Sequence, residues 1–303
     1  MSQEENSSGL QHRLGRVPVV GYAFDWGWSL LSLPRKLRFL RTRLEETRTE
    51  LRETQDALWE LRDQFKINGL MADDHDNDEF YIRFENTFRG TEDEIKERLR
   101  VYVPYLRKLK LDFSKHPVLD IGCGRGELMD LLHEEQINAI GLDLNESMVA
   151  RCNERGLTAV QADAFAYLAE QKTGSLGAIT GFHIAEHIPF GQLLNLFREC
   201  ERVLVPGGMV IFETPNPENI DVGSYTFYYD PSHLHPLAPP VLSFALETRG
   251  FKVDVLRLHP KLTDEQLAGI SDPHVAEVVR RFNTARDFAV LGYKKKKSTK
   301  PAK

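Results

Sequence analysis

A loop with three alternate glycines is the part of this sequence best suited to holding a ligand. It lies in the stretch VLDIGCGRGELMDLL, in which Gly122, Gly124 and Gly126 give the spacing GxGxG. Alternate glycines let the backbone turn sharply and approach a ligand closely, and the free N–H groups at the start of a following helix attract negative charge. The sixth position is Glu127, so the GxGxxG spacing of dinucleotide sites is not met, and the loop does not end in GK[ST] as a phosphate loop would. Because an acidic residue would repel pyrophosphate, we expect a ligand without phosphate, with a cationic or neutral centre and one carboxylate.

Three aspartates stand where predicted strands end. Asp120 precedes the glycine loop, and Asp143 ends AIGLD, 17 residues after Gly126. A carboxylate at the position of Asp143 can accept both hydroxyls of a ribose. Asp163, in VQADAF, can accept from an adenine amino group. Strand-ending aspartates often only cap helices, but three in register favour a nucleoside-like ligand.

A second group of residues can act on a substrate. His183, Glu186 and His187 lie in GFHIAEHIPF, directly after the fourth predicted strand, and His233 lies in the long segment 215–240, which is rich in Pro, Tyr and Asn. Loops of that length are usually functional. Each of the four side chains is a candidate general base for taking a proton from a hydroxyl. Two alternatives stay open: His187 can simply tie its loop to the neighbouring one, and the aromatic residues of 215–240 can either stack on sugars or pack over the other ligand.

The elements that position these residues alternate between strands and helices. Short apolar runs with β-branched residues are separated by helical segments such as 127–135 and 191–204. This alternation predicts an α/β fold, a doubly wound, mostly parallel sheet covered on both faces. Seven strands are expected, from the runs PVLDIG, NAIGLDL, LTAVQAD, GAITGF, GMVIFET, FKVDVLRL and DFAVLGY.

The composition of the chain limits its expected partners and its cellular compartment. The chain has 303 residues, 41% of them hydrophobic, and a net charge of -6, which argues against a nucleic-acid partner. Its three cysteines have no CxxC spacing, so they indicate a reducing compartment and no zinc site, and we predict no bound metal. No cleavable signal peptide is visible, and we predict a cytoplasmic protein.

Four regions are predicted along the chain. Residues 1–36 contain an apolar, aromatic stretch (17–33) that is too short to span a membrane and suits either a membrane interface or docking on protein. Residues 37–70 carry leucines at heptad spacing on a charged background, which favours a self-associating coiled-coil arm and hence a homo-oligomer over a helix packed on its own domain. A globular domain is expected over 80–293, followed by a basic tail over 294–303.

The motifs together resemble the class I S-adenosylmethionine-dependent methyltransferases. VLDIGCGRG, GLDLNESMV, ADAFAYL and RVLVPGGMVIFETPN are similar to that family's successive motifs and follow its order. The resemblance implies a Rossmann-like methyltransferase fold with S-adenosylmethionine as cofactor. It also implies that Asp120 and the glycine loop hold the methionine moiety, Asp143 the ribose, and Asp163 with Ala164 the adenine.

A narrower resemblance concerns the acceptor. FYIRFENTFRGTEDEIKERLRVYVPYL and ETPNPENIDVGSYTFYYDPSHLHPL are similar to methyltransferases of bacterial surface-polysaccharide (O-antigen) assembly. That implies O-methylation of a glycan or lipid-linked saccharide, on a sugar hydroxyl or terminal phosphate, at the inner face of the cytoplasmic membrane, with polysaccharide-assembly proteins as partners of the coiled coil. The alternatives are a methyltransferase of a free small molecule or a quinone-type lipid, and a non-catalytic scaffold.

Overall fold

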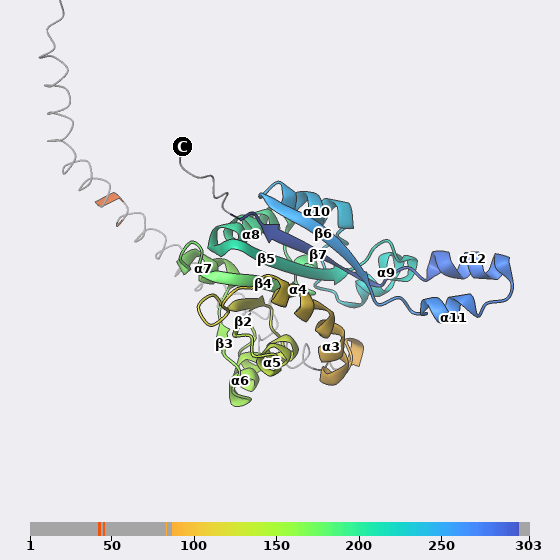
Figure 1. The fold of residues 1–303 in the computed structure, drawn as a ribbon, viewed down its shortest axis with the longest axis horizontal. Helices are drawn as coiled ribbons and strands as arrows, with labels where there is room; N and C mark the ends of the chain where they lie inside the picture. Colours follow the sequence, from red (N-terminus) through yellow and green to blue (C-terminus); the bar gives the residue numbers. More distant parts are fainter. Residues whose placement is uncertain (1–41, 44, 46–82, 84–86, 297–303) are drawn as a thin grey trace, which may run out of the picture. The chain divides into compact units, whose positions relative to one another are not determined.

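In the computed structural model, the described residues are 42, 43, 45, 83 and 87–296 (Figure 1). The chain divides into two compact units, Met1–Asn77 and Asp78–Lys303. Of the first unit, Thr42, Arg43 and Glu45 are helical and exposed. The predicted membrane-facing segment (1–36) and the rest of the predicted coiled coil (37–70) lie outside the described residues, as do residues 297–303 of the tail. No helix in the described part of the chain is long and apolar enough to cross a bilayer.

A single sheet organises the second unit. Within residues 87–296 it has seven strands in the order β3-β2-β1-β4-β5-β7-β6, which confirms the predicted seven-stranded α/β fold. Strands β1 to β5 pair in parallel, and β7 runs antiparallel to both β5 and β6. The strand bounds are β1 Val118–Ile121, β2 Ala139–Asp143, β3 Ala159–Gln161, β4 Leu176–Phe182, β5 Leu204–Pro215, β6 Phe251–Leu258 and β7 Asp287–Lys294.

The strand order reverses between β1 and β4. From β1 the chain builds outward through β2 and β3, then returns to place β4 on the other side of β1. In open α/β sheets, ligands collect outside the carboxyl ends of the strands at such a point. The topology therefore places the functional crevice at the end of β1, where the glycine loop begins.

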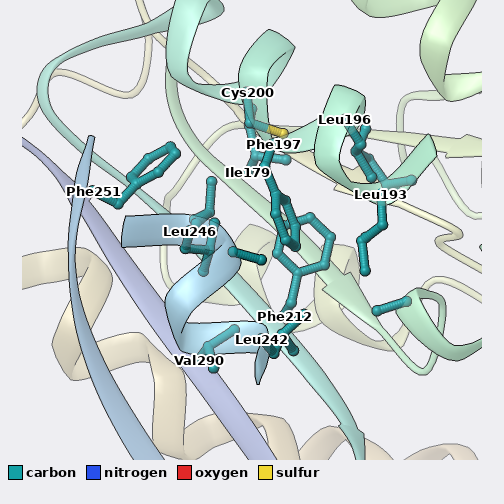
Figure 2. Close-up of a cluster of buried hydrophobic side chains, with 14 of the residues drawn as sticks. Ile179, Leu193, Leu196, Phe197, Cys200, Phe212, Leu242, Leu246, Phe251 and Val290 are labelled. Carbon is teal, nitrogen blue, oxygen red and sulfur yellow. The ribbon is translucent and has the colours of Figure 1, made fainter. Parts of the chain in front are cut away.

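Both faces of the sheet are covered because successive strand residues point to opposite sides. One face packs on α8 and α10, where Phe197, Leu246 and Phe212 belong to one buried cluster (Figure 2). The other face packs on α3, η1, α4 and α5, where Tyr102 and Leu131 are fully buried. The helix bounds on these faces are α8 Phe190–Val203, α10 Pro239–Glu247, α3 Glu92–Leu99, η1 Arg100–Tyr102, α4 Val103–Lys108 and α5 Glu127–Glu134.

Of the remaining helices, α6 packs on β2 and β3, and α7 packs on α8. Side-chain caps set several starts: Asn145 accepts from the Met148 amide at the start of α6, and Asp272 caps α12. Lys294, assigned to the basic tail by the sequence prediction, is instead the last residue of β7, and its Nζ donates to the Leu204 carbonyl at 3.0 Å. The bounds are α6 Glu146–Glu154, α7 Ala164–Glu170, η2 Ala185–His187, α9 Ile220–Ser224, η3 Thr226–Tyr229, α11 Asp264–Ala268 and α12 Pro273–Phe282.

Candidate functional site

The glycine loop forms a cradle that only glycine can adopt. Gly122, Gly124 and Gly126 have φ values of 68°, 50° and 84°, in the left-handed region. A Cβ at Gly126 would also lie 2.8 Å from the Sγ of Cys152, closer than real Cβ contacts come. Gly126 is the N-cap of α5 and, among the described residues, no side chain caps this helix. The amides of Cys123, Gly124 and Gly126 are bonded within the protein, so the predicted contact with a ligand stays a prediction for the other amides at the start of α5.

Asp143 anchors this loop from the end of β2. Its Oδ2 accepts from the Gly124 amide at 2.8 Å, and its Oδ1 accepts from the Asn145 amide at 2.9 Å. A carboxylate has about four lone-pair positions, so both oxygens can still accept from hydroxyl groups. The side chain is half-buried and held on two sides, which suits the predicted contact with a ribose.

Asp120 is a buried carboxyl at the end of β1. It is 3% exposed and accepts from Oγ1 of Thr180 at 2.7 Å. Burial raises the pKa of Asp120 to about 7, although the Thr180 hydroxyl and the charge of Arg89 oppose the shift. A carboxyl held this way would gain from a ligand cation, so its chemistry fits the ammonium group of a methionine moiety.

Asp163 is the N-cap of α7, with Oδ1 accepting from the Ala166 amide at 2.9 Å. The helix-capping alternative is thus present, and the contact with adenine stays a prediction for Asp163 and for Ala164, the first residue of α7. Glu127 requires a correction. The sequence argument treated it as a free negative charge, whereas it forms a buried ion pair with Arg125 at 2.6 Å, so its charge is compensated and does not by itself exclude phosphate.

The four predicted substrate-side residues come together next to the glycine loop. Ile184 links the two regions, because a Cβ at Gly122 would lie 3.1 Å from its Cδ1. Oε1 of Glu186 lies 3.4 Å from Nδ1 of His183 and 3.8 Å from Nε2 of His233. The rings of His187 and His233 have centroids 4.7 Å apart. The loop after β4 and the segment 215–240 therefore form one constellation.

His183 is surrounded by carboxylates. Its Nε2 lies 3.4 Å from Oε1 of Glu213 and 3.9 Å from Oδ1 of Asp287, while Glu186 faces its Nδ1. Burial alone would lower the pKa of His183, but Glu186 and Glu213, with Asp287, outweigh it and raise the pKa to about 10. His183 also has a positive φ of 55°, an unusual conformation for a non-glycine residue. A protonated imidazole donates rather than accepts a proton, so the role of general base does not suit His183 at neutral pH.

The other two histidines are each held through Nδ1. His233 Nδ1 lies 2.6 Å from the Phe227 carbonyl, which accepts only from an N–H, so Nδ1 carries a proton. Ser232 Oγ donates to Asp230 at 2.6 Å, so His187 Nδ1, 2.9 Å from that oxygen, is the donor there. Burial lowers the pKa of His187. This contact with Ser232 links the loop of His187 to the segment 215–240, as the alternative prediction for His187 expected.

Sequence reasoning missed three members of the constellation. Glu213 lies in β5 and Asp287 begins β7, and neither was singled out; Tyr102, from η1, donates its hydroxyl to Glu213. Burial is the first cause that raises the pKa of Tyr102, and Glu213 adds to it. An acidic residue near the carboxyl end of a buried parallel strand, as in FETPN, was the available signal for Glu213. For Tyr102 and Asp287 the sequence held no comparable signal.

The crevice, the glycine cradle and the carboxylates after β1 and β2 define a nucleoside-binding α/β enzyme, and comparison with known proteins makes it specific. Residues 118–208 match a family model described as a methyltransferase domain. A solved SAM-dependent methyltransferase from Archaeoglobus fulgidus is 32% identical, covers 71% of this chain and 100% of its own, and superimposes with a TM-score of 0.62. The chain belongs to the S-adenosylmethionine-dependent methyltransferases, as its motifs predicted, and it is an enzyme with that cofactor.

Two curated relatives share part of this sequence. A ubiquinone biosynthesis O-methyltransferase of Methylococcus capsulatus is 33% identical over 106 residues, which are 32% of this chain and 43% of that protein. A probable S-adenosylmethionine-dependent methyltransferase of Mycolicibacterium smegmatis is 33% identical over 138 residues, 45% of this chain and 52% of that protein. The chain thus spans about half the length of the curated relatives it matches.

Proposed function

We propose that the enzyme transfers the methyl group of S-adenosylmethionine to a hydroxyl oxygen. The observation that carries this proposal is the constellation of Glu186, His187 and His233, which presents a carboxylate and two imidazole rings beside the cofactor cradle. A hydroxyl must lose its proton as its oxygen is methylated, whereas a phosphate oxygen has none to lose. Proton-accepting groups at this place are needed only for a hydroxyl acceptor.

The charge of the site also argues against the predicted phosphate acceptor. Glu186, Glu213 and Asp287 surround His183, and Asp230 lies near His233. An anionic phosphate would meet an excess of negative charge in a partly buried site, where repulsion is strong. A neutral hydroxyl avoids that cost.

A quinone-type lipid phenol is the acceptor that the observations favour. The Methylococcus capsulatus relative is named for ubiquinone biosynthesis and O-methylation, which supports such an acceptor more directly than a glycan. Apolar side chains next to the constellation remain in solvent: Leu234 is 52% exposed, and its amide donates to the carbonyl of Glu186. Tyr225 and Tyr228 are exposed in the same segment. This surface offers an apolar tail a place beside the reacting hydroxyl.

A sugar hydroxyl of a lipid-linked glycan is the second candidate. The exposed tyrosines of 215–240 support it, because aromatic faces stack on sugar rings and their hydroxyls can bond sugar oxygens. The predicted link to O-antigen assembly, with partners bound through residues 37–70, rests on this candidate.

In the proposed reaction, the bound cofactor supplies a methyl group activated by its sulfonium. Asp120, the glycine loop and Asp143 would hold the cofactor, beside the segment that follows β4. His187 and His233 lie on the acceptor side, where they would assist the loss of the hydroxyl proton. Protonated His183 keeps Glu186, Glu213 and Asp287 compensated.

The acceptor is testable by methyl labelling. The full chain would be incubated with cofactor carrying a labelled methyl group and a bacterial membrane lipid extract, and the products separated into quinone lipids and glycolipids. Label in a phenolic ether of a quinone-type lipid is the expected result. Label in a glycolipid that resists phosphatase and methyl-ester cleavage selects the sugar hydroxyl, and label released as a methyl phosphate contradicts the hydroxyl proposal.

A further inference from the structure

We propose that Glu186, His187 and His233 form a binding site for one divalent transition-metal ion, such as Zn²⁺. One ligand atom from each side chain lies within 4.8 Å of the other two. Two histidines and one carboxylate form a common ligand set for catalytic Zn²⁺ and for Fe²⁺ with open positions. Ligand atoms about 2.1 Å from a tetrahedral ion lie roughly 3.4 Å apart, so closing the site needs small side-chain movements only.

The buried carboxylate carries an independent sign of a missing partner. Glu186 is 0% exposed, and its Oε2 accepts from Oγ1 of Thr214 at 2.9 Å. Its Oε1 is buried and, among the described residues, receives no hydrogen bond, although it faces the two imidazoles of His183 and His233. A buried carboxylate oxygen without a hydrogen bond is costly and calls for an explanation. A bound cation supplies one.

The surroundings of both histidines match those of metal ligands. A ligating histidine usually donates its other ring N–H to a carbonyl or a carboxylate-linked group, which fixes the tautomer and the ring orientation. The carbonyl of Phe227 holds Nδ1 of His233, and the chain from Asp230 through Ser232 holds Nδ1 of His187. In a neutral ring held this way, Nε2 is the nitrogen with a free lone pair for a metal ion. A general base needs one such nitrogen, whereas a metal site needs several that converge.

A neighbouring group of possible metal ligands is already held together by a protonated histidine. His183, Glu213 and Asp287 also place ligand atoms within 4.8 Å of one another. There the imidazolium of His183 already lies between the carboxylates, and Tyr102 donates to Glu213. A cation arriving at Glu186 would replace its interaction with Nδ1 of His183, while Nε2 stays paired with Glu213. The metal site is therefore assigned to the first group, which replaces the sequence-based expectation of no metal.

The ion gives the proposed function a specific chemistry, and this part of the inference rests on that function. An acceptor hydroxyl that occupies the open coordination position loses its proton to solvent water, because a bound Zn²⁺ strongly lowers the pKa of a coordinated O–H. The resulting oxygen anion then forms the C–O bond as the S–CH₃ bond breaks and its electron pair stays on sulfur. A phenol, with a pKa near 10, would be fully ionised at such a site at neutral pH.

The decisive measurement is metal binding itself. The full chain, free of affinity tags and stripped with a chelator, would be titrated with Zn²⁺ by calorimetry and with Co²⁺ by visible absorption. One ion per chain is expected in the wild type and in His235→Ala, a matched control that changes an exposed histidine two residues from His233. Glu186→Gln and His233→Ala should each weaken binding by about 100-fold or more while binding S-adenosylmethionine normally, which shows that they are folded.

Two outcomes would overturn the inference: no ion bound by the wild type, or binding that Glu186→Gln and His233→Ala leave intact. These outcomes are separate from the fate of the proposed function. Methylation of a hydroxyl by metal-free enzyme would refute the ion's role in the reaction and leave the proposed function standing, and a bound ion without hydroxyl methylation would refute the acceptor alone.

Discussion

The cofactor side of this site comes from one short stretch of the chain, whereas the acceptor side is assembled from segments far apart in the sequence. On the cofactor side, Asp120, the three glycines and Asp143 come from residues 120–143 and act largely through backbone geometry, with φ values of 50° to 84° at the glycines. On the acceptor side, the participating side chains come from five separate segments between Tyr102 and Asp287. A local loop geometry is recorded in a short motif, whereas an assembly of distant side chains depends on the whole fold.

The two sides also differ in how they treat charge. On the cofactor side, burial raises the pKa of Asp120 to about 7, so this carboxyl is about half ionised at neutral pH. On the acceptor side, although burial opposes it, His183 keeps the pKa values of Glu186 and Glu213 below their usual range. The first arrangement is ready to receive a cation, and the second is already compensated by one. Mutations on the two sides should therefore separate cofactor affinity from turnover.

The largest effect is expected on the acceptor side. His233→Ala removes a free imidazole nitrogen from the reacting oxygen, and losing such a group typically lowers turnover by ~10²- to 10⁴-fold. Affinity for S-adenosylmethionine should change by less than about twofold, because His233 does not contact the cradle residues. Steady-state kinetics with calorimetry checks both values. His235→Ala is the control, and a similar loss of turnover in that variant would show that the segment, not the imidazole, matters.

The next effect concerns stability. His183→Ala leaves Glu186, Glu213 and Asp287 without their cation, and breaking a buried pair costs about 3 kcal/mol when one partner is partly exposed. The pKa of His183 is about 10 in the folded protein, whereas the ordinary pKa of a histidine is 6.5. Its contribution is therefore fully present below pH 6.5 and is lost as pH rises through 10.

Urea denaturation between pH 6 and pH 10 tests this. The free energy of unfolding of the wild type should fall across that window, and the difference from His183→Ala should shrink in parallel. His116→Ala is a matched change of a partly buried histidine far from the constellation along the chain. A constant difference across the window would mean that His183 is neutral.

The sequence predicted most of the fold because most strands were compact apolar runs, while β6 alternates apolar and charged residues. All seven runs became strands, and the helical segments 127–135 and 191–204 correspond to α5 and α8 within one residue at either end. Burial on both faces produces this pattern locally, without reference to distant residues. The antiparallel pairing of β7 between β5 and β6 leaves no such trace in the run DFAVLGY.

The site was predictable where a motif ties chemistry to backbone shape, as at Gly122, Gly124 and Gly126. The site was less predictable where the protonation state of a side chain decides its role. In the sequence, His183 and His233 were equivalent candidates for the general base. The structure distinguishes them, because three carboxylates surround His183 whereas His233 bonds a backbone carbonyl. Asp287 lies more than a hundred residues from His183, so no local pattern could have joined them.

A smaller effect is expected on the cofactor side. Asp143→Ala removes a carboxylate that holds the Gly124 amide and is placed to accept ribose hydroxyls, and an unmade hydrogen bond costs ~1 to 3 kcal/mol, about ten- to a hundredfold in affinity. Turnover at saturating cofactor should change little, opposite to His233→Ala. Calorimetry measures the affinity, and Asp143→Asn, which keeps one acceptor oxygen, should lose less. Unchanged affinity in Asp143→Ala would contradict the assignment of the ribose contact.

The smallest effect is a dependence of cofactor affinity on pH that isolates Asp120. With its pKa near 7 in the free enzyme, Asp120 is about nine-tenths protonated at pH 6, because burial disfavours the charged form. The ammonium group of the cofactor's methionine moiety would favour the ionised carboxylate, so binding must release that proton, and affinity should rise roughly tenfold from pH 6 to pH 7.5. Staying below pH 7.5 keeps an α-amino group largely protonated.

Calorimetry in two buffers of different ionisation enthalpy should show close to one proton released at pH 6 and markedly fewer at pH 7.5. Asp120→Asn, which keeps the shape of the side chain and an acceptor for Thr180, should bind more weakly and without this dependence. An affinity that is flat with pH in the wild type would mean that Asp120 does not meet the cofactor's cation and acts only in holding the end of β1 to β4.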